Sequence, residues 1–176
     1  MTIGEGVLSV EDSVFFACSQ LHDVQLPCSL RHIGDNSFRG CGGLSSIALP
    51  PNLISIGEYA FYACPQLASL TVPGSVQSIG SNAFSGAAKL SSITYGYGCV
   101  HTGEYACNQD AALEKVTLPD TMKSVDYGAF QRCSKLTSVV VGQGLDSIGY
   151  AGFARCTGLS TLMLPSSVSS VLSNAF

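Results

Sequence analysis

The stretch SIGEYAFYAC, residues 55–64, decides the fold because it returns along the whole chain. Alignment on its Phe61 places a phenylalanine at every twenty-third position, with no insertion and with one replacement, by cysteine. A fixed period of this length is the signature of a repeat protein, in which each repeat is one coil of a stack. The aligned positions are Phe15, Phe38, Phe61, Phe84, Cys107, Phe130, Phe153 and Phe176.

Other positions of this stretch form columns with the same period. Ile56 stands in a column of Val, Ile and Thr, and Cys64 stands in a column that Ala87 and Asp110 interrupt. Gly57 recurs as Gly34, Gly80, Gly103 and Gly149. We expect the Ile, Ala, Phe and Cys positions to point into the coil, and Gly to permit a bend that a side chain would obstruct.

A second phrase, L-x-x-I-x-L-P, lies between the copies of the first. Its copies include LSSIALP (44–50), LASLTVP (67–73), LEKVTLP (113–119) and LSTLMLP (159–165). The residues before the proline alternate inward and outward as in a strand, and the Pro or Gly that follows ends the pairing. Each repeat therefore predicts one short strand, and stacked repeats predict a parallel sheet of about seven strands.

The pattern covers residues 1–176 as one solenoid of about seven repeats. Ile3–Gly4 falls at the tail of a predicted strand, and the chain stops at Phe176 before the next Cys position, so we expect both ends to be cut within a repeat. Such ends expose apolar surface and an open strand edge. We therefore expect this chain to be part of a longer array, or its ends to be covered by something else.

Composition excludes several classes of function. The chain has 176 residues, of which 46% are apolar and 11% charged, with a formal net charge of −4. Sparse and mostly acidic charge is unsuited to holding phosphates, so we expect no nucleic acid partner. No apolar run reaches the roughly 20 residues that span a bilayer, and the acidic start MTIGEGVLSVEDSVFFAC shows no signal peptide.

The repeat unit resembles the BspA-type leucine-rich repeat of 23 residues. The pattern LxxIxLPxxLxxIGxxAFxxC stands here as LASLTVPGSVQSIGSNAFSGA (67–87) and LTSVVVGQGLDSIGYAGFARC (136–156). The resemblance implies a right-handed, curved solenoid with a concave parallel sheet, irregular or short helical turns on the convex side, and protein partners bound by the sheet. It also favours a cell-surface or secreted adhesion protein.

Two outward columns of the predicted sheet are the candidate binding surface. They carry mainly small hydroxyl side chains, which suit a crowded β surface with or without a ligand. Their alternative use is a shallow protein-binding trough, with Val140 and Met163 as an apolar anchor at its C-terminal end. The column of Thr71, Thr94 and Thr117 could also suggest an ice-binding surface, but only these three consecutive repeats have threonine there. The predicted contact residues are Ser46, Ser69, Thr71, Ser92, Thr94, Lys115, Thr117, Ser138, Val140, Thr161 and Met163.

The fifth repeat, YGYGCVHTGEYACNQD (95–110), departs most from the pattern. Cys107 replaces the phenylalanine and Cys99 replaces an inward Leu or Val. These two cysteines could form a disulfide, or join His101 in a weakly indicated metal site, although we predict no metal. The third interpretation is a degenerate repeat in which Tyr95, Tyr97 or Tyr105 fills the space of the lost Phe ring.

No nucleophile motif, phosphate-binding loop or HExxH sequence is present, so we expect neither an enzyme nor a cofactor. Three hypotheses remain. The chain is an adhesion module that binds another protein, an architectural subunit inside a larger assembly, or a carbohydrate binder that uses the Ser/Thr trough without an aromatic platform.

Overall fold

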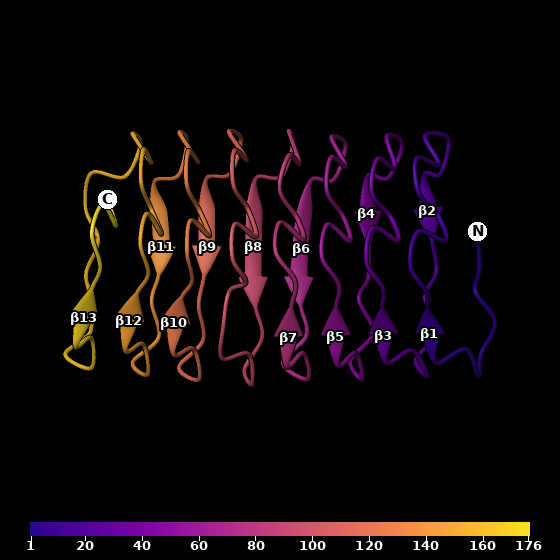
Figure 1. Ribbon diagram of the computed structural model, residues 1–176, viewed down its shortest axis with the longest axis horizontal. Coiled ribbons are helices and arrows are strands. Elements are labelled where there is room, and N and C mark those ends of the chain that lie inside the picture. Colours follow the sequence, from indigo (N-terminus) through magenta and orange to yellow (C-terminus); the bar gives the residue numbers. More distant parts are fainter.

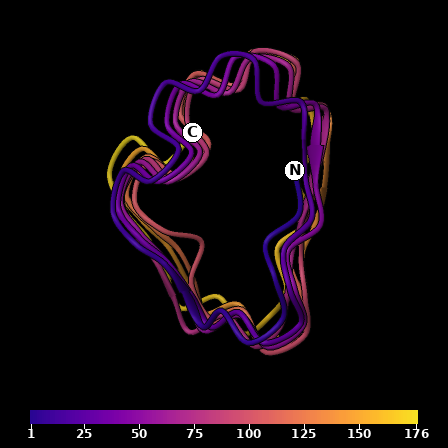
Figure 2. The same cartoon turned by 90° about the vertical axis from the view of Figure 1, so that its right-hand side faces the viewer.

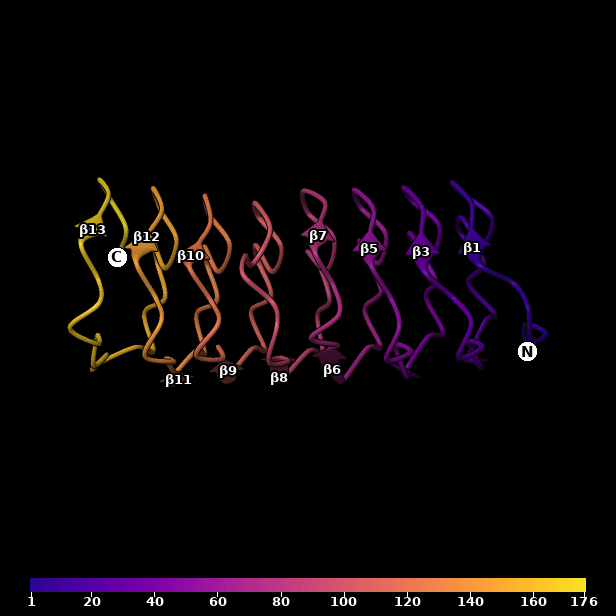
Figure 3. The same cartoon turned by 90° about the horizontal axis from the view of Figure 1, so that it is seen from below.

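The computed structural model describes all residues from 1 to 176 as a single stack of coils (Figure 1). It contains thirteen short strands and no helix, and all strand pairs are parallel. The strands fall into two sets that point in opposite directions in Figure 1 and lie on opposite sides of the stack in Figure 3. We call each coil after its residue in the phenylalanine column.

The first set, which we call the threonine face, consists of the strands that the sequence predicted. Paired residues differ by one period, as in Leu70↔Ile93 and Thr71↔Thr94. Six strands form, and residues 161–163, where the sequence predicts a seventh, belong to no strand. The predicted repeat solenoid is confirmed, and the stack is nearly straight in Figures 1 and 3. The strands are β2 (Asp23–Val24), β4 (Ser46–Ile47), β6 (Ser69–Val72), β8 (Ser92–Tyr95), β9 (Lys115–Thr117) and β11 (Ser138–Val140).

The second set, which we call the serine face, was not predicted from the sequence. Here every coil except the Cys107 coil contributes a two-residue strand, such as Ser55–Ile56, where the sequence predicts only a turn, and the Cys107 coil contributes a single bridge at His101. Its outward residue is serine or histidine and its inward residue is mostly Ile or Val. The strands are β1 (Ser9–Val10), β3 (His32–Ile33), β5 (Ser55–Ile56), β7 (Ser78–Ile79), β10 (Ser124–Val125), β12 (Ser147–Ile148) and β13 (Ser170–Val171).

The turn that contains the phenylalanine uses two left-handed residues per coil. In the Phe61 coil these are Tyr59 (φ 54°) and Ala63 (φ 54°), two positions before and after the ring. The repeated Gly57 has a different role: a Cβ there would lie 2.4 Å from Asp35 Oδ1 and 2.6 Å from the Gly34 carbonyl carbon. The glycine is therefore required by the close approach of the preceding coil.

The core is a set of columns that run along the stack. Phe38, Phe61 and Phe84 are fully buried, and their rings stack with centroids 5.2 and 6.1 Å apart. A second ring stack begins at Phe130, whose centroid is 5.3 Å from that of Phe153. The two stacks are separated by the Cys107 coil, whose trace leaves the common outline in the end-on view of Figure 2.

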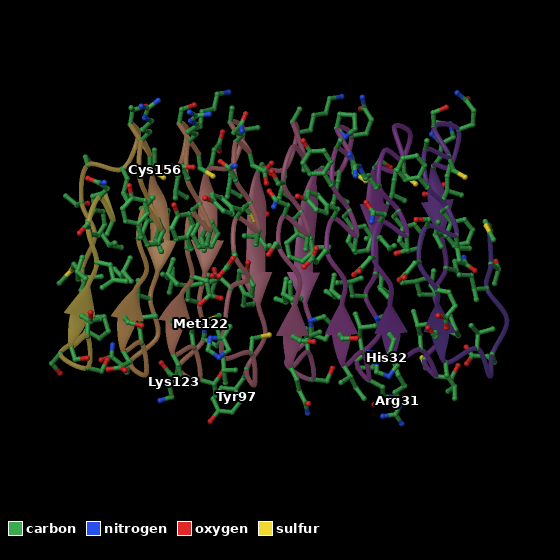
Figure 4. All side chains as sticks on the ribbon, viewed as in Figure 1. Arg31, His32, Tyr97, Met122, Lys123 and Cys156 are labelled. Atoms are coloured by element: carbon green, nitrogen blue, oxygen red, sulfur yellow. The ribbon has the colours of Figure 1, made fainter.

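In the Cys107 coil, Tyr95 supplies the missing aromatic ring. It is 1% exposed and its hydroxyl donates to the Thr102 carbonyl at 3.2 Å. Burial raises the pKa of Tyr95 well above its usual value, which keeps the phenol protonated. Of the three tyrosines that the sequence offered, Tyr97 instead points to solvent, and Figure 4 shows it projecting beyond the lower edge of the ribbon.

Candidate functional site

The threonine face brings most of the predicted contact residues together in register. Strand pairing places Ser69, Ser92, Lys115 and Ser138 in one row. A second row two residues along contains Thr71, Thr94, Thr117 and Val140. The residues between these rows, such as Leu70 and Ile93, are buried, so both rows point outward. Ser46 extends the first row and pairs with Asp23.

The hydroxyl groups of these rows are free to bind a partner. In the neighbouring column, Ser91 Oγ donates to the Ala68 carbonyl at 3.0 Å and Thr137 Oγ1 to the Glu114 carbonyl at 3.5 Å. The hydroxyls of Thr71, Thr94 and Thr117 take part in no side-chain hydrogen bond within the chain. A binding partner can therefore use them without breaking an internal contact.

A hollow of about 400 Å³ lies on the N-terminal half of the threonine face. It sits between β4 and β6, which belong to separate sheets. Ser46, Ser69 and Thr71 line it together with apolar atoms of Leu49 and Pro73. This is the part of the predicted surface where a protruding side chain of a partner finds the most room.

The C-terminal end of the predicted surface differs from the rest. Val140 ends β11 and is 50% exposed, whereas Met163 is 90% exposed and belongs to no strand. Thr161 is also exposed and borders a separate hollow of about 310 Å³ near Phe176. Of the two residues in the predicted apolar anchor, Val140 thus belongs to the paired strands, whereas Met163 lies outside them.

The cysteines of the fifth repeat are buried free thiols. Cys99 Sγ donates to the Pro73 carbonyl at 3.3 Å, and Cys107 is fully buried below Tyr95. The Cys99–Cys107 disulfide is absent from this structure and stays a prediction. His101 lies on the exposed serine face, and no three metal-ligating side chains come together there or elsewhere.

Cys41 and Cys64 in the N-terminal coils are packing groups rather than reactive thiolates. Burial is the main cause that raises the pKa of Cys64 to about 12 and that of Cys41 to about 11. Each thiol donates to a carbonyl of the preceding coil, for example Cys64 Sγ to the Phe38 oxygen at 3.2 Å. A nucleophilic cysteine requires the opposite shift of its pKa.

The largest concave feature lies on the serine face, which the sequence reasoning did not consider as a site. It is an open groove of about 910 Å³ that crosses six coils, from Glu58 to Leu172. Its lining includes the strand residue Ser78, the bridge residue His101 and the turn residues Glu104 and Tyr127. His32 and His101 are three periods apart, a spacing that could have revealed this outward column.

A cluster of His101, Ser124 and Asp126 lines part of this face but does not have the geometry of a hydrolase triad. His101 Nδ1 is hydrogen-bonded to Ser124 Oγ at 2.8 Å and lies 3.7 Å from Asp126 Oδ1. Ser124 itself donates to that carboxylate. In a triad the imidazole stands between serine and carboxylate and uses both ring nitrogens, whereas here one nitrogen faces both groups.

Comparison with known proteins identifies the repeat. A family model described as the BspA type leucine-rich repeat region matches six copies, over residues 1–109 and 100–176. The chain belongs to the BspA-type leucine-rich repeat family. Comparison with curated protein sequences gave no match. Leucine-rich repeat proteins are generally scaffolds for protein interaction and are generally not catalytic.

Solved structures of bacterial leucine-rich repeat proteins share this fold. A T. pallidum leucine-rich repeat protein is 30% identical, with a TM-score of 0.83 over 90% of this chain and 77% of that chain. A protein from Eubacterium ventriosum is 25% identical, with a TM-score of 0.82 over 85% of this chain and 41% of that chain. A leucine-rich cell surface protein from Faecalibacterium prausnitzii is 24% identical (TM-score 0.54, 94% and 53% covered) and shows the fold alone. The structure contains no helix that could cross a membrane.

Proposed function

We propose that this chain is a non-catalytic protein-binding module of the cell-surface adhesion type, and that its partner binds the threonine face. The observation that carries the proposal is the register of the Thr71–Thr94–Thr117 row, whose hydroxyls have no partner inside the chain. Donors and acceptors repeat there at about 4.8 Å, the spacing of neighbouring strands. The adhesion role rests on the family resemblance.

The hollow between β4 and β6 supplies the second requirement of an interface, which is a place for an anchoring side chain. Its lining combines the polar groups of Ser46, Ser69 and Thr71 with the apolar Leu49 and Pro73. Protein interfaces concentrate their binding energy in a few side chains that fill such depressions. The row of hydroxyls would set orientation, and the hollow would hold the anchor.

The test compares two threonine-to-arginine variants in capture of partners from an extract of the native source. Thr94→Arg places a long charged side chain in the middle of the row. Thr157→Arg is the control, because Thr157 is exposed in a turn outside the two rows and its hydroxyl makes only one long hydrogen bond, to the Ser134 carbonyl at 3.4 Å. Proteins that bind wild type and Thr157→Arg but are lost with Thr94→Arg support the proposal. Equal capture by both variants contradicts it, provided that both melt at the wild-type temperature.

A further inference from the structure

The groove on the serine face differs in its chemistry from the threonine face. It crosses six coils, which at about 4.8 Å per coil gives a length of roughly 24 Å. Glycines of the Gly57 column, including Gly80, Gly103 and Gly149, are among its lining residues. A trough of this length suits an extended chain rather than a compact small molecule.

The charged groups of the groove are almost all acidic. Glu58, Glu104 and Asp126 line it, His101 is the one basic side chain present, and no lysine or arginine takes part. Asp126 is fixed in place, since its Oδ2 accepts the Gly103 N–H at 2.9 Å. Glu58 and Glu104 are exposed and engage in no hydrogen bond or ion pair through their side chains. Their carboxylates are therefore available to a cation.

The acidic character continues past the groove along the same column. Asp35 and Asp12 precede Glu58 by one and two periods, and they are bound to the backbone of the next coil. Asp35 Oδ1 accepts the Glu58 N–H, and Asp12 Oδ1 accepts the Asp35 N–H, both at 2.7 Å. Negative charge is thus held along one line of the surface, where its field attracts a cationic segment.

The tyrosines of the groove favour a hydrogen-bonded cation over a stacked sugar ring. Tyr127 and Tyr150 stack on each other, with centroids 5.0 Å apart and planes at 18°. Tyr105 packs its edge toward Tyr127 at 4.9 Å. Tyr150 covers one ring face of Tyr127, and the exposed part of Tyr127 can offer a phenolic oxygen as an acceptor. A sugar that stacks on a ring needs an uncovered face.

We propose that the serine-face groove binds an extended, lysine- or arginine-rich peptide segment of another protein. About seven extended residues cover roughly 24 Å at about 3.3 Å each. The cationic side chains would meet the carboxylates of Glu58, Glu104 and Asp126. The serines that line the groove, such as Ser78, would accept hydrogen bonds from the backbone or side chains of the peptide. The charge complementarity of the groove selects this occupant over an acidic or neutral chain.

The probe is fluorescein-labelled heptaarginine, and its binding to the intact chain is followed by fluorescence anisotropy. The groove pair Glu58→Gln/Glu104→Gln removes two carboxylates from the lining. The control pair Glu5→Gln/Glu114→Gln removes the same formal charge from exposed sites outside the groove. We expect the groove pair to weaken binding at least about tenfold and the control pair less than about twofold, with labelled heptaserine not binding.

Three results would overturn the proposal. Heptaarginine could fail to bind the wild-type chain, both pairs could weaken binding equally, or neither pair could weaken it. Equal weakening would show attraction to the net charge alone. Thermal melts of both variant pairs establish that they are folded, and because only exposed side chains are exchanged, a wild-type melting temperature is expected.

Discussion

The Phe84 coil and the Cys107 coil fill the same interior volume in opposite ways. In the Phe84 coil the last inward residue of the strand is Val72 and the turn supplies a phenylalanine. In the Cys107 coil the strand supplies Tyr95, which pairs in register with Val72, and the turn supplies a cysteine. All four side chains are at most 1% exposed. A large and a small residue have exchanged places, and the outward Thr94 remains in its row.

This difference teaches that the packing constraint acts on each coil as a whole. Interiors are packed to nearly crystalline density, so the volume lost at one column must be supplied by another. Because the exchange happens inside the coil, β8 keeps its pairing with both β6 and β9. The outer face can thus stay continuous while the core changes.

The largest effect is expected where the phenylalanine stack is regular. Phe61→Ala removes a fully buried ring that stacks between Phe38 and Phe84. We expect a loss of about 3–5 kcal/mol in the free energy of unfolding. Urea titration followed by circular dichroism measures it. A loss below about 1 kcal/mol would show that the column is not the main source of stability.

Restoring the consensus residue in the irregular coil should be harmful. Cys107→Phe brings a ring into a space that Tyr95 already occupies, so we expect a destabilisation of about 1–3 kcal/mol by overpacking. The same titration measures it. A more stable variant would mean that the coil has an unfilled cavity and that the two coils differ in packing density.

Asp110 distinguishes the two coils by its response to pH. It occupies the cysteine column, is fully buried, and accepts the Ala87 N–H at 2.8 Å. Burial is the main cause that raises the pKa of this carboxyl well above its usual value. The folded state therefore keeps a proton that the unfolded state releases above about pH 4, so stability falls as pH rises from there toward the raised pKa.

The expected slope for this single proton is at most about 1.4 kcal/mol per pH unit. Unfolding titrations of wild type and Asp110→Asn between pH 4 and 8 measure the difference, because the other groups cancel in the comparison. A steeper fall for the wild type is expected. Parallel pH profiles would show that Asp110 ionises as freely in the folded state as in the unfolded state.

The smallest effect concerns the polar end of Tyr95. Tyr95→Phe keeps the ring but removes the hydrogen bond to the Thr102 carbonyl, which should cost about 1 kcal/mol. The readout is the shift of the urea midpoint. An unchanged midpoint would assign the role of Tyr95 to its ring alone.

Much of this architecture could be predicted from the period of the sequence. Away from the end coils, the columns that contain Phe61, Ile56 and Cys64 are largely buried as expected, and the Thr71–Thr94–Thr117 row is in register. The serine face escaped prediction because two residues such as Ser55–Ile56 are too few to show the alternation of a strand. Its groove depends on which turn residues stand beside those strands, and only the coil geometry brings His101 and Tyr127 to the lining of one groove.

The choice of Tyr95 as the ring that fills the Cys107 coil also required the structure. Tyr95, Tyr97 and Tyr105 all belong to the repeat of Cys107, and the sequence pattern does not choose among them. Strand pairing with Val72 turns only Tyr95 inward. Tyr105 has a positive φ of 51° and packs against Tyr127 in a T-shaped arrangement. The sequence pattern identifies the defect, and the pairing register identifies its compensation.

The central claim, that Tyr95 and Cys107 exchange volume with the Val and Phe of a regular coil, is tested most directly by a double-mutant cycle. The free energy of unfolding is measured for wild type, Tyr95→Val, Cys107→Phe and the variant with both changes. We predict that each single change lowers the free energy of unfolding. We also predict that the loss in the double variant is at least about 1 kcal/mol smaller than the sum of the two single losses. Additive losses would contradict the claim and would mean that the two side chains do not share one space.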